Sequence, residues 1–228
     1  AKEKNLFQTI NSNYLIERIP EAYRDPDNYW FGLSLRSRVI IYAQDRADPN
    51  ELSTYQDLTN EKWHKKLCVR SSSNIYNQSL VASLIAHMGI ENTEQWAKGL
   101  VNNFARAPKG GDRDQIKAVA AGLCDLALVN KYYVGGMADS KLVADQETVR
   151  NINIYWPNQN TTGAHVNLSG IGLTRSSKNT QEAIQLIEFL LNDDSQSWYS
   201  EINYEYPVVS TIEYSDKLKQ WGLFEADD

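Results

Sequence analysis

Short apolar segments alternate with amphipathic segments through most of this 228-residue chain, and this alternation constrains its fold most strongly. Apolar residues at helical spacing before Gly89, and again between Asp112 and Gly122, predict helices that end at a glycine. Apolar runs between those helices predict strands. We expect strands at residues 31–43, 67–70, 124–130, 151–156 and 165–174, and helices at residues 80–88, 93–103, 112–121 and 180–192. Helices that alternate with short apolar strands indicate an α/β fold with a mainly parallel sheet.

The composition excludes several classes of protein. Hydrophobic residues make up 42% and charged residues 23% of the chain, which is typical of a globular protein and not of a disordered one. The net charge of −6 argues against a nucleic-acid-binding protein, because such proteins neutralise phosphates with lysine and arginine. The sequence also contains no apolar run that approaches the roughly 18 residues of a membrane span.

Two features bear on the compartment. The chain begins Ala1-Lys2-Glu3-Lys4, without a methionine or a charged-then-apolar signal segment, so we expect a processed chain or a fragment. Its two cysteines, Cys68 and Cys124, are too few for a disulfide framework and too widely spaced to resemble a zinc site. They are either two buried thiols or one disulfide, and a disulfide would indicate an oxidising compartment.

Tyrosines follow two of the predicted strands. Tyr76 comes shortly after the strand at 67–70, and Tyr132 and Tyr133 follow the strand at 124–130. Ligands of open α/β sheets bind beyond the carboxyl ends of the strands, so these three phenols are candidates for one site. Adjacent tyrosines in a strand would point to opposite faces, and both can face one ligand only if the chain turns, which Gly135-Gly136 permits. Three phenols would suit a hard cation such as Fe³⁺; the alternative is that they are packing residues.

Two polar turns are candidates for an anion site. Ser72, Ser73 and Asn74 precede a predicted helix, where backbone N–H groups and the helix dipole favour an anion, although a plain capping turn explains them equally well. The Gly110-Gly111-Asp112 turn has the same two interpretations. Asp112 and Asp114 would form a carboxylate pair if they were not simply an exposed helix start.

A hydrolase with an Asp/His site is a weak alternative. The three histidines are His64, His87 and His165, and none neighbours a serine or cysteine in a recognisable nucleophile motif. We expect each of them to be structural or exposed.

Four segments carry a family resemblance: LCVRSSSNIYNQSLVASLIAHMG (67–89), GGDRDQIKAVAAGLCDLALVNKYYVGG (110–136), HVNLSGIGLT (165–174) and NYEYPV (203–208). Together with RDPDNYWFGLSLRSRVIIYA (24–43), they resemble the bacterial periplasmic ferric-ion-binding proteins, the solute-binding components of iron(III) ABC importers. The resemblance covers nearly the whole chain. It implies a two-lobed α/β periplasmic binding protein of type II, with hinge strands and with the beginning of the first lobe missing.

The resemblance also implies the function and the ligands. Ferric ion would sit in the interlobe cleft on the tyrosinate oxygens of Tyr76, Tyr132 and Tyr133, completed in some members by a His-Tyr pair or a Tyr from the missing segment and in others by an anion such as carbonate. Many members carry a basic residue where this chain has Gly136, so we expect Arg36 or Arg38 to offset the tyrosinate charge instead, unless they are surface arginines.

The implied organisation is a binding protein and not an enzyme. We expect an N-terminal lobe of residues 1–38 and 163–213 and a C-terminal lobe of residues 39–162 and 214–228. The protein would work as a monomer in the periplasm, deliver iron to the permease and ATPase of an ABC importer in the inner membrane, and derive from a parent chain with a signal peptide. The alternative is a binding protein of the same class for an oxyanion or a polyamine.

Overall fold

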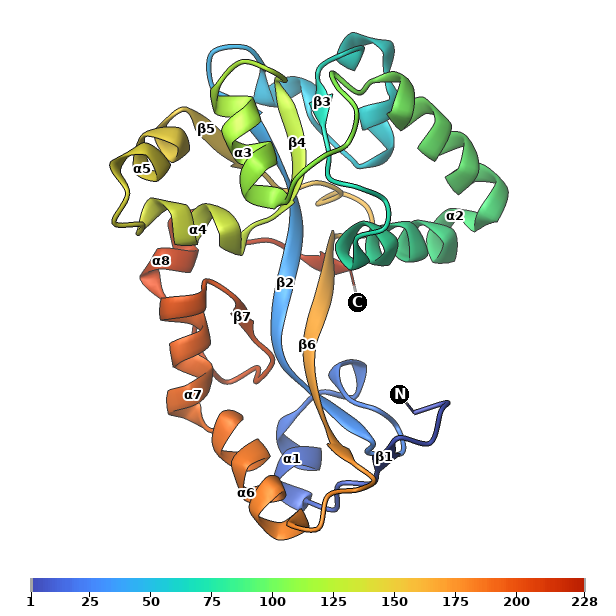
Figure 1. The fold of residues 1–228 in the computed structure, drawn as a ribbon, viewed down its shortest axis with the longest axis vertical. Coiled ribbons are helices and arrows are strands. Elements are labelled where there is room, and N and C mark those ends of the chain that lie inside the picture. The colour runs from blue at the N-terminus through green and yellow to red at the C-terminus, as the bar shows by residue number, and fades with distance from the viewer. Residues whose placement is uncertain (1, 228) are drawn as a thin grey trace. The chain divides into compact units, whose positions relative to one another are not determined.

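The computed structural model describes residues 2–227 and divides into two compact units (Figure 1). Unit 1 contains residues 1–36 and 168–223, and unit 2 contains residues 37–167 and 224–228. Both boundaries in the middle of the chain fall inside long strands, β2 (Trp30–Ala43) and β6 (Ala164–Thr174), so each of these strands contributes one end to each unit. Both units combine helices with strands, as the sequence predicts.

Unit 1 has a small amount of sheet and several short helices. Strand β1 pairs antiparallel with β6, and β7 pairs antiparallel with β2. The buried Gln196 amide joins two segments, because it donates to the Leu33 carbonyl and accepts from the Val208 N–H. The elements are β1 (Phe7–Gln8), α1 (Asn13–Arg18), η1 (Glu21–Tyr23), α6 (Thr180–Leu190), α7 (Asp193–Trp198), η5 (Tyr199–Asn203), β7 (Tyr206–Pro207) and α8 (Asp216–Lys219).

The segment 214–223, expected in the C-terminal lobe, belongs to unit 1 in this structure. Its anchor is Ser215, whose N–H donates to the Ser200 hydroxyl at 2.7 Å and whose hydroxyl donates to the Ser200 carbonyl at 3.0 Å. These contacts hold the start of α8 against η5, a connection between residues that sequence patterns do not reveal.

Unit 2 is built around a sheet in which β2 pairs with β4 and β5, and β4 pairs with β3. The expectation of a mainly parallel sheet is wrong for these strands: β2 is antiparallel to both β4 and β5, and only the β3–β4 pair is parallel. The chain between the two parallel strands, β3 and β4, is helical, as the long connection between parallel strands usually is. The elements are η2 (Pro49–Glu51), η3 (Gln56–Thr59), η4 (Glu61–Trp63), β3 (Leu67–Cys68), α2 (Ile75–Asn102), α3 (Asp112–Ala120), β4 (Leu126–Asn130), α4 (Tyr132–Ala138), α5 (Val143–Arg150), β5 (Ile152–Tyr155) and β8 (Ala226–Asp227).

Both faces of the unit 2 sheet are buried, because successive strand residues point to opposite sides. On one side Ile40 and Leu128 pack against apolar residues of α2, including Leu84. On the other side Ile41 and Val129 pack against residues of α3 and α4. Each such side chain contributes about 1.5–3 kcal/mol when fully buried. The continuous apolar runs of β2 and β4 in the sequence follow from this two-sided burial.

Helix α2 consists of two arms that meet at Gly89, whose backbone lies outside the helical region at φ 81° and ψ 166°. A non-glycine residue would be strained there, which explains why the sequence places glycine at the break. The prediction of two helices separated at this residue is therefore confirmed.

Cys68 and Cys124 form a disulfide, and both are buried. The bond joins β3 to the residue that lies two positions before β4, with the two Cα atoms 5.9 Å apart and 56 residues apart in sequence. A loop of this length corresponds to about 4 kcal/mol of stabilisation in the chain-entropy treatment. Within residues 2–227, no helix is both long and apolar enough to cross a membrane.

Candidate metal centre

The parallel β3–β4 pair positions the tyrosines. Leu67 pairs with Leu126 and Cys68 with Ala127, so both strands end at the same edge of the sheet. Beyond that edge, the chain enters α2 after β3 and α4 after β4. This arrangement brings the Tyr76 and Tyr132 hydroxyl oxygens to within 3.2 Å of each other, although the residues are 56 positions apart.

Tyr133 lies beside Tyr132 because the chain turns immediately before the pair. Lys131 has helical backbone angles (φ −58°, ψ −38°), and both tyrosines occupy the first turn of α4. Their ring centroids are 4.2 Å apart and the ring planes differ by 31°. The chain therefore turns at the pair, as a shared ligand would require, and Gly135 and Gly136 lie inside the helix that forms this turn. We call Tyr76, Tyr132 and Tyr133 the phenol cluster.

The phenol cluster is neutral at its centre in the absence of a cation. Burial raises the pKa of Tyr132 above its usual value, and the nearby phenols of Tyr133 and Tyr76 raise this pKa further. Tyr132 therefore carries its proton at neutral pH. The preceding Lys131 is fully buried, and burial lowers its pKa to about 6.

The geometry of the phenol cluster is compatible with a shared small cation. Oxygens that each lie about 2 Å from one octahedral ion are about 3 Å apart, close to the Tyr76–Tyr132 separation of 3.2 Å. Anionic oxygens favour hard ions. The described part of the chain contains no group of three or more His, Cys, Asp or Glu side chains that could hold a metal ion.

Both arginines expected to face the tyrosines hydrogen-bond to other groups. Arg36 belongs to unit 1, where its guanidinium donates to the Leu168 carbonyl at 3.0 Å. Arg38 is 1% exposed and pairs with Asp112 at 2.9 Å, with further hydrogen bonds to Asn130 and to the Leu128 carbonyl. Arg38 is thus a buried, paired arginine and not a surface arginine.

Sequence reasoning missed Arg70 and placed Asp112 in an exposed position. The Asp112 carboxylate is fully buried, not exposed at a helix start, and it pairs with both Arg38 and Arg70. The Arg70 guanidinium lies over the Tyr76 ring, with its central carbon 5.6 Å from the ring centroid. We call Arg38, Arg70 and Asp112 the guanidinium–carboxylate cluster. The available signal for Arg70 was its place at the end of a predicted strand, the same signal that identified the tyrosines.

The two polar turns act as helix caps. The Asn74 side chain accepts from the Tyr76 N–H at 3.0 Å and so caps α2, and the Ser71 hydroxyl accepts from the Ser73 N–H and lies 2.9 Å from the Ser73 hydroxyl. At α3, the Asp114 carboxylate accepts from the Gly111 N–H at 2.7 Å. Capping accounts for all these contacts.

Two further expectations concern Gly136 and the histidines. A side chain at Gly136 would meet the Arg113 guanidinium, since an added Cβ would lie 3.3 Å from one of its nitrogens. His87 pairs with Asp227 at 2.7 Å, and His165 shares a 2.8 Å hydrogen bond with Ser79. Burial lowers the pKa of His165 to about 4, so this imidazole is neutral at neutral pH. His64 follows η4 in an exposed turn.

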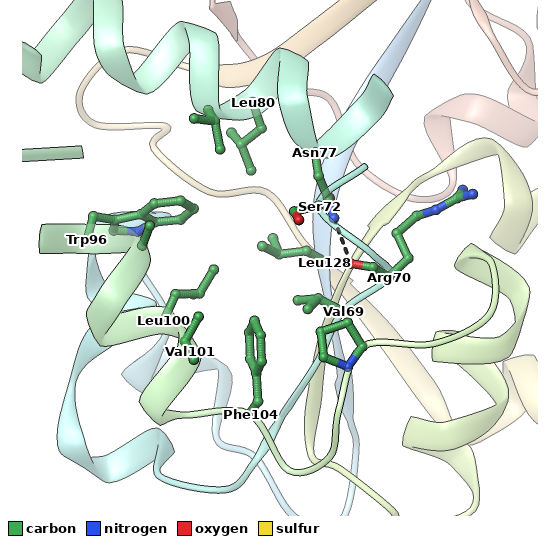
Figure 2. A pocket seen from close by; sticks show the side chains of 13 residues that line it. Val69, Arg70, Ser72, Asn77, Leu80, Trp96, Leu100, Val101, Phe104 and Leu128 are labelled. Carbon is green, nitrogen blue, oxygen red and sulfur yellow. Dashed lines mark hydrogen bonds between the residues drawn. The ribbon is translucent and has the colours of Figure 1, made fainter. Parts of the chain in front are cut away.

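A separate cavity of about 340 Å³ lies between the two arms of α2 and the sheet. Figure 2 shows that its walls are mainly apolar side chains, such as Leu80 and Trp96, and that the Arg70 guanidinium points away from them. The tyrosines of the phenol cluster are not part of its lining. Its apolar character does not suit a metal ion.

Comparison with known families gives a match to the bacterial extracellular solute-binding proteins over residues 1–224. Among curated proteins, iron uptake proteins A1 and A2 of Synechocystis are each 43% identical to this chain across its full length. The chain spans 63% of the first and 66% of the second, that is, slightly less than two thirds of each.

Solved structures give the same result. A Trichodesmium protein (IdiA, FutA) in complex with iron and citrate is 46% identical, with a TM-score of 0.95, and the alignment covers 99% of this chain and 72% of that one. The ferric binding protein from Campylobacter jejuni is 38% identical, with a TM-score of 0.95 and coverage of 100% and 72%. These likenesses confirm the expected two-lobed α/β fold.

Proposed function

Because the chain belongs to the bacterial extracellular solute-binding protein family, we propose that it is part of a protein that binds ferric iron through Tyr76, Tyr132 and Tyr133. Members of this family are components of transport systems, so the expectation that the chain is not an enzyme is confirmed. The iron is the cargo of the protein and not a resident cofactor.

The observation that carries the proposal is the convergence of three phenols from two separate helix starts. The Tyr76 and Tyr132 oxygens are 3.2 Å apart, and the Tyr133 ring packs beside that of Tyr132. A packing role would not require phenol oxygens from different elements to meet at one point. A trivalent ion at that point would replace the phenol protons and hold the oxygens as phenolates.

Proton displacement gives the proposed site its pH dependence. The pKa of Tyr132 is raised, so the metal must compete with a firmly held proton, and acid weakens binding. Reduction of the ion also weakens binding, because a less charged and softer ion gains less from hard anionic oxygens. Both effects provide routes to iron release.

The relatives support ferric iron over the alternative ligands. The two Synechocystis proteins are named for iron uptake, and the two structures are named for bound iron or for ferric binding. One of these names includes citrate, but together with iron, and none of the four refers to a polyamine.

Several finer features belong to the proposal. An anion such as carbonate completes the iron shell near Ser72, Ser73 and Asn74, at the positive end of α2, two residues from Tyr76. The protein works as a monomer in the periplasm, its parent chain carries a signal peptide, and it delivers iron to the permease and ATPase of an ABC importer. The N-terminal lobe and the C-terminal lobe correspond to units 1 and 2.

The proposal is tested by colour and iron content. The oxidised protein is incubated with ferric citrate, freed of excess iron, and examined by visible absorption and metal analysis. We expect bound iron and a tyrosinate-to-iron charge-transfer band, and we expect both to be lost in the Tyr132→Phe/Tyr133→Phe variant.

Tyr14→Phe is the matched control, because Tyr14 lies in unit 1 and is 41% exposed. This variant should keep the full band. A wild-type protein that stays colourless and free of iron would refute the function, and an unchanged band in the double variant would refute the ligand assignment.

A further inference from the structure

We infer that Arg70 supplies the positive charge that stabilises the Tyr76 phenolate in the metal-bound protein, and that Asp112 is its positioning residue. This inference rests on the proposed function, since it concerns the affinity of the same site. It concerns a residue that neither the family resemblance nor the expected role of Arg36 and Arg38 had identified.

The Arg70 guanidinium lies close enough to the Tyr76 ring to attract a phenolate held by a bound metal ion. The guanidinium carbon is 5.6 Å from the ring centroid, within the range of a cation–π interaction. With a neutral phenol, the guanidinium interacts only with the ring quadrupole. With a phenolate, it also interacts with a full negative charge, so the attraction is stronger in the form that binds metal.

Two hydrogen bonds hold Arg70 in this position, one through its side chain and one through its backbone. One of its nitrogens donates to the Asp112 carboxylate at 3.2 Å, and its backbone carbonyl accepts from the Asn77 side chain at 2.9 Å, as the dashed line in Figure 2 shows. The guanidinium points away from the apolar cavity. With 20% of its side chain exposed, Arg70 is shielded enough from water for its charge to act on Tyr76.

Asp112 cannot neutralise Arg70 completely, because it is shared. Its second oxygen accepts from Arg38 at 2.9 Å and from the Asn130 N–H at 2.8 Å. Two guanidinium groups thus face one carboxylate, which leaves the guanidinium–carboxylate cluster with a net charge of +1. Since Asn130 is also the last residue of β4, the same carboxylate fixes the strand that leads to Tyr132.

The test compares Arg70→Gln with the wild type by competition for ferric ion against citrate. We expect about a tenfold loss of iron affinity, the size that a partly desolvated cation–π or ionic contact provides. The charge-transfer band should move to longer wavelength, because removal of a positive charge raises the energy of the phenolate electrons. A merely structural role would not move this band.

A double-mutant cycle shows whether Arg70 acts on iron affinity through Tyr76. If Arg70 acts through the Tyr76 phenolate, Arg70→Gln should have no further effect on iron affinity in a Tyr76→Phe protein. Arg70→Met is a second neutral variant of similar length, to be used if the glutamine variant does not fold. Arg46→Gln is the control, because Arg46 pairs with Asp125 before β4, at the opposite end of that strand from the tyrosines.

The outcomes separate the two proposals. If the wild type binds no iron, the proposed function fails. If the wild type binds iron but a folded neutral variant at position 70 binds it equally tightly with an unchanged band, the proposed function stands and the role of Arg70 is refuted. An equal loss in the presence and absence of the Tyr76 hydroxyl would also refute it.

Discussion

Two polar clusters lie at the same edge of the unit 2 sheet, and they differ in how their charges are satisfied. In the guanidinium–carboxylate cluster, Asp112 uses both oxygens in ion pairs and hydrogen bonds within the protein. In the phenol cluster, the central Tyr132 keeps its proton because burial and neighbouring phenols raise its pKa. In the first cluster the carboxylate is fully paired within the protein, whereas the phenols of the second are the groups that would bind the cation under the proposed function.

This difference distinguishes groups that stabilise the fold from groups that serve a ligand. The effect of a buried ion pair on stability is largest when one partner is removed, because the other partner is then left buried, charged and unpaired. We expect a hydrogen bond between neutral phenols to contribute less to stability than a buried ion pair. A perturbed pKa therefore points to a functional residue only when the hydrogen-bond and charge partners of that residue are also known.

The most direct test of the difference between the two clusters is to remove the Asp112 carboxylate. We expect Asp112→Ala to lower the free energy of unfolding by about 3–5 kcal/mol, because Arg38 would be left buried without its partner. Tyr76→Phe should change this free energy by no more than about 1 kcal/mol, the value of a single neutral hydrogen bond. Urea denaturation of the metal-free proteins measures both; comparable losses in the two variants would contradict the distinction.

The disulfide offers a second, smaller test, since it joins the last residue of β3 to a residue before β4 and includes no member of either cluster. The Cys68→Ser/Cys124→Ser variant should lose about 2–4 kcal/mol of stability, as native disulfides of small domains typically provide. Iron affinity of the folded variant should stay within about threefold of the wild type, because the β3–β4 pairing that aligns the tyrosines remains. Thermal unfolding and citrate competition check the two expectations, and a variant that is stable but unable to bind iron would show that the bond itself shapes the site.

The smallest effect concerns alkaline pH. The pKa of Tyr132 is higher in the folded chain than in the unfolded chain, where it is near 10. Its contribution to stability is therefore complete below about pH 10 and is lost as the pH rises toward the pKa of the folded state. The metal-free wild type should therefore lose stability above about pH 10 more steeply than Tyr132→Phe does. Denaturation midpoints measured between pH 8 and pH 11 test this, and parallel curves would mean that the phenol is not buried as described.

The sequence was sufficient for the local features of the site. Apolar spacing located α2, α3 and β4, and Gly89 marked the break in α2. The place of Tyr76, Tyr132 and Tyr133 after two strands was enough to nominate them as one site. These features depend on residues that are close in the chain, so their periodicity and turn preferences can be recognised from the sequence.

Only the tertiary structure decided which distant groups meet. Arg38 and Asp112 are 74 residues apart, and their burial together could not be read from the helix-start pattern that made Asp112 look exposed. Three other features could not be read from the sequence either. They are the direction of β2 relative to β4, the turn at Lys131 and the position of Arg70 over Tyr76. Each depends on strand pairing and on the balance between desolvation and ion pairing, which arise only when separate segments come together.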